Sequence, residues 1–105
     1  MARTAYKFLL CSTITSVHGA NARWLTVTSV QEVVKGKIVW EGTVDTFELL
    51  KHPQAKFCYA WSLEVDDIIV VLTALKIAPV VSAHSAIHIA YHEGKLDPKR
   101  HLLIK

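Results

Sequence analysis

The segment 57–65 constrains the fold more than any other part of the chain. Large apolar side chains alternate there with small or polar ones: Phe57, Tyr59, Trp61, Leu63 and Val65 against Cys58, Ala60, Ser62 and Glu64. Successive side chains of a β-strand point to opposite faces, so this period of two predicts a strand. A row of large apolar side chains usually forms core rather than a ligand platform, so we expect Trp61 to be buried.

Further strands are expected on both sides of this segment. Asp66-Asp67 is expected to form a two-residue turn into 68–77, which is apolar on both faces, as in a central strand. On the other side, Lys35-Gly36 is expected to turn the chain between strands over 23–34 and 37–49.

Two segments in the first third of the chain carry conflicting signals for their secondary structure. Residues 5–17 are rich in Thr, Ile, Val and aromatic groups, which predicts a strand. Their Ser and Thr residues dilute what would otherwise resemble the apolar part of a signal peptide. The segment Ser29-Val30-Gln31-Glu32 has a capping-box pattern, so a short helix over 29–35 stays open. The β-branched content there favours a strand.

The C-terminal part of the chain predicts one helix. Pro79 ends the preceding strand, Ser82 is placed to cap a helix that runs to about Glu93, and Gly94 can stop it. The expected fold is therefore an α+β domain over residues 1–105, an antiparallel meander of about five strands with one C-terminal helix packed on the sheet.

Composition bears on how many copies of the chain associate. Of its 105 residues 51% are hydrophobic, and a single domain this small cannot bury that much apolar surface alone. We therefore expect a homodimer. The net charge of +3 is carried mainly by basic chain ends, which we read as solvated. No run is long enough to span a membrane, and a cytoplasmic location is expected.

Three histidines in the predicted helix form the most suggestive polar pattern. His84, His88 and His92 are spaced by four residues, which places their rings along one helix face. A His pair at this spacing can hold a transition metal such as zinc, with Glu93 or a carboxylate of another subunit as a further ligand. The alternatives are a solvated row, or a subunit contact that responds to pH because protonated imidazoles repel.

Other candidate groups favour structural roles. Cys11 and Cys58 lie in apolar segments with nothing local to activate a thiol, and Asp66-Asp67 suits a turn. The aromatic row of 57–61 could stack nucleobases, but the residues that follow it carry acidic rather than basic side chains. Nucleic-acid binding is therefore a minor alternative. No phosphate-binding loop, dinucleotide fingerprint or paired-Cys zinc motif occurs, which argues against an enzyme.

Several short motifs resemble those of small uncharacterised bacterial proteins, including ones carried on mobile integron gene cassettes. The resemblance covers residues 40–92 and rests on Trp40-x-Gly42-x-Val44, Phe47, His52-Pro53-x-Ala55, Tyr59-Ala60-Trp61-Ser62 and Pro79-Val80-x-Ser82. It implies no catalytic residues. This chain departs from the pattern at Val81, where an acid is expected, and at His88, where a basic residue is expected, so the His row is peculiar to it.

These observations favour a non-enzymatic binding or assembly module that forms a homodimer and has no resident cofactor. The alternative is a small metal- or ligand-binding protein that uses the flank of the helix lined by His84, His88 and His92.

Overall fold

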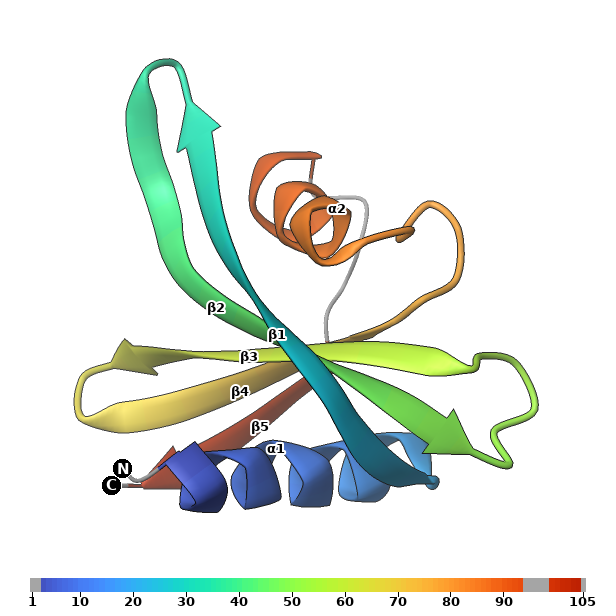
Figure 1. Ribbon diagram of the computed structural model, residues 1–105. Helices are drawn as coiled ribbons and strands as arrows, with labels where there is room; N and C mark the ends of the chain where they lie inside the picture. Colours follow the sequence, from blue (N-terminus) through green and yellow to red (C-terminus); the bar gives the residue numbers. More distant parts are fainter. Residues whose placement is uncertain (1–2, 94–98, 105) are drawn as a thin grey trace.

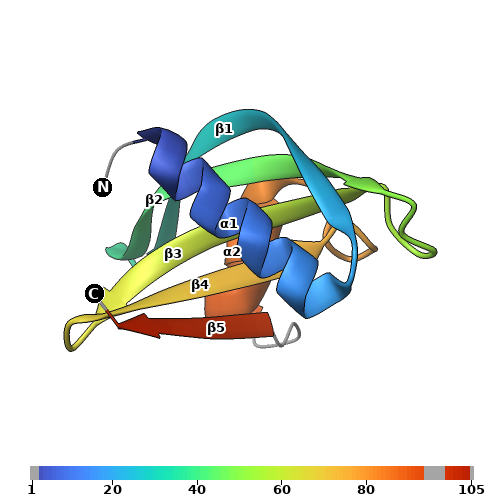
Figure 2. The same cartoon turned by 90° about the horizontal axis from the view of Figure 1, so that it is seen from below.

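The computed structural model describes residues 3–93 and 99–104, with the backbone alone for Arg3, Val65, His92, Glu93 and 99–104. Its elements in chain order are α1 (Arg3–His18), β1 (Asn21–Val34), β2 (Lys37–Leu50), β3 (Phe57–Val65), β4 (Ile68–Leu75), α2 (Ala83–His88), the π-helix η1 (Ile89–Glu93) and β5 (Lys99–Ile104). The strands form one antiparallel sheet in the order β1-β2-β3-β4-β5. α1 lies across one face and α2 lies over the other (Figures 1 and 2).

The strand predicted over 5–17 is wrong, because this segment forms α1. Its apolar side chains recur at helical spacing, and Leu10 and Ile14 are fully buried against the sheet. The hydroxyl of Thr13 donates to the carbonyl oxygen of Leu9 at 2.9 Å, which satisfies a buried polar group inside the helix. Tertiary packing thus overrides the strand propensity of the Thr, Ile and Val residues.

The other four predicted strands are present as β1 to β4, and the antiparallel α+β class is confirmed. The alternative short helix over 29–35 is absent, since β1 runs through to Val34. Both predicted turns are found, with positive φ at Lys35 and Gly36 (52° and 78°) and at Asp66 and Asp67 (50° and 65°). Two successive positive φ angles suit the twist of a tight hairpin.

The remaining strand and the number of helices differ from expectation. The sheet is completed on the far side of β4 by β5, at the end of the chain, in place of an N-terminal strand. Two helices rather than one C-terminal helix cover the described sheet. Each face of the sheet therefore has its own helix, and the core is divided into two layers.

The alternation in β3 separates these two layers. Tyr59 and Trp61 point toward α2, whereas Cys58 and Ala60 point toward α1. Trp61 is 0% exposed, which confirms its prediction as a core residue. The α2 layer comprises Val30, Val44, Tyr59, Trp61, Leu72, Ala74, Val80, Ala83, Ala86, Ile87 and Ile89. The α1 layer comprises Leu10, Ile14, Phe47, Leu49, Ala55, Cys58, Ala60 and Val71.

The hairpin formed by β1 and β2 extends well beyond its junction with the rest of the sheet. Its only ladder with β3 joins Asp45–Glu48 to Phe57–Ala60. Beyond this ladder the hairpin bends away from the other strands and rises beside α2 (Figure 1). Side chains of the hairpin and of α2 meet in this region, and the candidate site lies there.

Candidate functional site

The start of α2 is fixed by a reciprocal cap. Backbone N–H of Ser85 donates to the Ser82 hydroxyl at 3.1 Å, and backbone N–H of Ser82 donates to the Ser85 hydroxyl at 2.8 Å. This confirms Ser82 as the N-cap. The α-helix extends only to His88, after which the chain continues as η1 to Glu93. The cap sets the rotation of the helix and so directs His84 and His88 toward the hairpin.

A buried carboxylate lies between these two imidazoles. Glu32 on β1 is only 3% exposed, although Lys, Arg, Asp and Glu are rarely buried to this degree. Nδ1 of His88 donates to its Oε2 at 2.9 Å, and Nε2 of His84 lies 3.4 Å from its Oε1. Among the described residues its ion-pair partners are these two histidines. A buried carboxyl group needs hydrogen-bonding partners, and here they come from a different element of the fold.

Aromatic side chains also connect the β1–β2 hairpin to η1. The rings of Trp40 on β2 and Tyr91 on η1 are stacked at 6.2 Å with 10° between their planes. The indole N–H of Trp61 donates to the Tyr91 hydroxyl at 3.1 Å. Trp40 lies opposite Glu32 in the β1–β2 register, so the aromatic stack and the carboxylate share one face of the hairpin.

The structure brings together part of the predicted histidine row. His84 and His88 converge on one acid, while the side chain of His92 and that of Glu93 lie outside the described residues. Among the side chains that are described, no three or more His, Cys, Asp and Glu form a group that could hold a metal ion. Zinc binding by His84, His88 and His92 stays a prediction.

Glu32 was not identified as a site residue from the sequence. Its capping-box position drew attention to the backbone of residues 29–32, and no helix begins there. The available signal was alternation: Val30 and Glu32 are two residues apart in a strand, so they share a face, and Val30 is buried. An acid on the buried face of a strand needs a polar partner, and that partner comes from α2.

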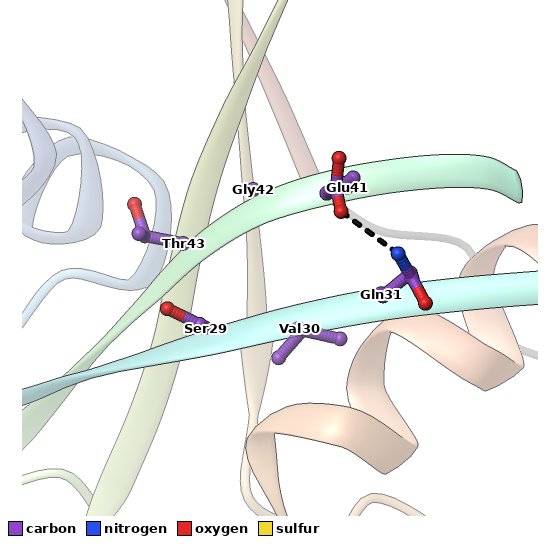
Figure 3. Close-up of a pocket in the computed structure, with 6 residues that line it drawn as sticks. All are labelled: Ser29, Val30, Gln31, Glu41, Gly42 and Thr43. Carbon is purple, nitrogen blue, oxygen red and sulfur yellow. Dashed lines mark hydrogen bonds between the residues drawn. The ribbon is translucent and has the colours of Figure 1, made fainter.

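A shallow hollow lies on the middle of the same hairpin. Its volume is about 490 Å³, and Figure 3 shows the residues that line it: Ser29, Val30, Gln31, Glu41, Gly42 and Thr43. The amide of Gln31 donates to Oε2 of Glu41 at 2.8 Å across the two strands. Hydroxyl, amide and carboxylate groups here offer hydrogen bonds to a small polar ligand.

The remaining candidates have structural roles. Burial raises the pKa of the Cys58 thiol from 9.0 to about 12, against a smaller opposing effect of a backbone hydrogen bond with Ala74, so this thiol is not a nucleophile at neutral pH. Cys11 donates to the carbonyl oxygen of Ala22 at 3.2 Å. Burial also raises the pKa of Tyr59. Tyr59 and Trp61 are buried in the core, so they do not form an open platform for bases.

No protein-family model, curated protein or solved structure matches this chain. In the part of the chain that the structure describes, none of the helices has the length and apolar character needed to cross a bilayer.

Proposed function

We propose that this chain is a non-enzymatic assembly module that acts as a homodimer. The observation that carries the proposal is the distribution of large apolar side chains at the surface. Among the side chains that the structure describes, most of those that are substantially exposed belong to the β1–β2 hairpin. On the hairpin they are Leu25, Val27, Val33, Ile38, Val39 and Leu50, and elsewhere Phe8, Ile77 and Val81.

The size of the molecule supports this proposal. A stable interface of standard size covers about 800 Å² of each partner. That is roughly an eighth of the 6385 Å² surface of the monomer. Covering apolar area contributes about 25 cal/mol per Å², which favours association over leaving this surface in water.

Light scattering coupled to gel filtration tests the proposal. We expect a mass of twice 11.7 kDa in the micromolar range, with dissociation on dilution. A mass of one chain at every concentration up to about 100 µM, well above the dissociation constants of specific dimers, would contradict it.

A second candidate function is ligand binding at the helix flank, where His84 and His88 meet Glu32. These three described side chains do not form a metal-binding group as they stand, so a metal would have to rearrange them. Ligand atoms around a tetrahedral zinc ion lie roughly 3.3–3.6 Å apart, given bonds of about 2.0–2.2 Å. The His84–Glu32 distance of 3.4 Å meets this requirement, whereas the His88–Glu32 distance of 2.9 Å is that of a hydrogen bond. A metal would have to open that bond to bind.

Thermal melts with zinc and with chelator test the second candidate. Zinc at a hundred times its dissociation constant would stabilise the parent by about 2.7 kcal/mol, and the His84→Gln/His88→Gln variant would lose this gain. The Glu32→Gln variant should lose it as well, since an amide is a poor ligand for zinc. If zinc leaves the melting temperature of each of the three proteins unchanged, a zinc site at this cluster is excluded.

A further inference from the structure

β1 is an end strand that carries little of the protection usual at a sheet edge. It spans Asn21–Val34, and among the described strands it pairs only with β2. Natural edge strands are commonly blunted by Lys, Pro or bulges, because their unpaired N–H and C=O groups invite another strand. No charged residue or proline lies between Arg23 and Glu32. Register shifts occur between Trp24 and Thr26 and beside Val33, and the ladder between them is regular.

The part of β1 nearest its N-terminal bulge is partly exposed on both faces. All residues of Leu25–Ser29 are exposed, with Val27 at 39%. By contrast, Val30 and Glu32 are buried beneath α2. Figure 1 shows β1 running from beside one end of α1 up past α2. A short stretch of open edge is thus bounded by the bulge on one side and by α2 on the other.

The three central residues of this stretch are symmetric in sequence. Thr26-Val27-Thr28 reads the same in both directions. A two-fold axis requires that residue i face residue j while j faces i, and an antiparallel pair centred on Val27 satisfies this requirement. Val27 would then lie opposite its own copy, and Thr26 opposite Thr28 of the second copy. Pairs of β-branched residues and Thr–Thr pairs stabilise antiparallel strands.

We propose that β1 pairs antiparallel with β1 of a second copy of this chain about a two-fold axis at Val27. This inference rests on the proposed homodimer and specifies its interface. The absence of charge supports a second copy as the partner, since like charges meet in a symmetric pair. The nearest charged residues, Arg23 and Glu32, lie outside the paired stretch.

Single cysteines test the register. Directly opposite residues in an antiparallel pair have Cα atoms about 4.5–5.5 Å apart, within the range that a disulfide can bridge. The Val27→Cys protein should therefore form a disulfide-linked dimer under mild oxidation with diamide. Two copies of residue 29 would be separated by four residues along the strands, roughly 13 Å, which is too far. The Ser29→Cys protein, exposed on the same face, is the matched control and should stay monomeric on a non-reducing gel, as should the parent.

A charge substitution tests the same contact without a cross-link. In Val27→Lys two ammonium groups would face each other across the axis, so the dissociation constant should rise at least tenfold. Thr43→Lys places the same charge on the same face of the hairpin, but on the inner strand β2, and should leave the dimer intact. Far-UV circular dichroism checks that both variants fold.

The possible failures are distinguishable. A monomeric parent would overturn both the proposed function and this inference. A dimeric parent with no Val27→Cys cross-link, or with a stronger cross-link at Ser29→Cys, would overturn the interface alone. A parent that is monomeric until a different protein binds its β1 edge would overturn the second copy as partner.

Discussion

A methyl group added at Gly42 probes the joint between the hairpin and η1. A Cβ atom at this position would lie 3.0 Å from Cζ2 and Cη2 of Trp40, which is tighter than most real Cβ contacts. The Trp40 ring cannot simply withdraw, because it is stacked on Tyr91, whose hydroxyl accepts the hydrogen bond from Trp61. We therefore expect Gly42→Ala to disturb the joint as a whole.

The net effect follows from two opposing contributions. Overpacking in a well-filled region costs about 1–3 kcal/mol. Replacing Gly by Ala reduces the freedom of the unfolded chain and returns about 0.4–1 kcal/mol. The expected loss is about 1–2 kcal/mol in the free energy of unfolding, equivalent to a fall in Tm of roughly 4–8 °C for a domain of this size.

Urea unfolding followed by far-UV circular dichroism measures this loss without depending on tryptophan emission. The decisive control is the Trp40→Ala background, in which the ring that meets the new methyl group is gone. There Gly42→Ala should become neutral or stabilising by up to about 1 kcal/mol. Stabilisation of the parent by Gly42→Ala, or an unchanged cost in the Trp40→Ala background, would refute the described packing.

Three further predictions address the core, the buried thiol and the carboxylate. Trp61→Ala should cost about 3–5 kcal/mol in urea unfolding because the side chain is fully buried, and a parent-like melt would contradict this. The Cys58 thiol ionises above about pH 9 in the unfolded chain but only near pH 12 in the folded protein. Between these values its ionisation should lower the free energy of unfolding by about 1.4 kcal/mol for each pH unit. Urea titrations from pH 8 to 10 should show this loss in the parent and not in Cys58→Ala. Glu32→Ala should lower the free energy of unfolding by about 1.5–3 kcal/mol. Glu32→Gln should lower it less, since the amide oxygen of Gln still accepts from His88. Equal losses for the two variants in thermal melts would argue against that hydrogen bond.

The parts of the fold that follow from local patterns were predictable. The alternation around Trp61 identifies a strand because each side chain reports on its own face. The Ser82 cap and the two-residue turns likewise depend on a few adjacent residues. The segment 5–17 was misjudged because propensity and periodicity disagree there. Its helix is stabilised by Leu10 and Ile14 packing on a sheet that the segment itself does not encode.

At the candidate site, too, the local features were predictable and the long-range contact was not. The spacing of His84 and His88 correctly places both on one helix face, which is a property of the helix alone. Glu32 lies 56 residues from His88 in the chain, and the two meet only because the hairpin bends past α2. No local pattern encodes that meeting.

The narrow ladder between β2 and β3 has a consequence for how the native state loosens. Beyond Asp45–Glu48 the hairpin has no backbone ladder to the central strands, and side chains of α2 and η1 hold it in place. Local opening follows such boundaries between cooperative units. The distal hairpin and α2 should therefore release their amide protons to solvent as one unit, while β3 and β4 retain theirs until global unfolding. Although its strands form one sheet, the distal hairpin and the central strands should open as separate cooperative units.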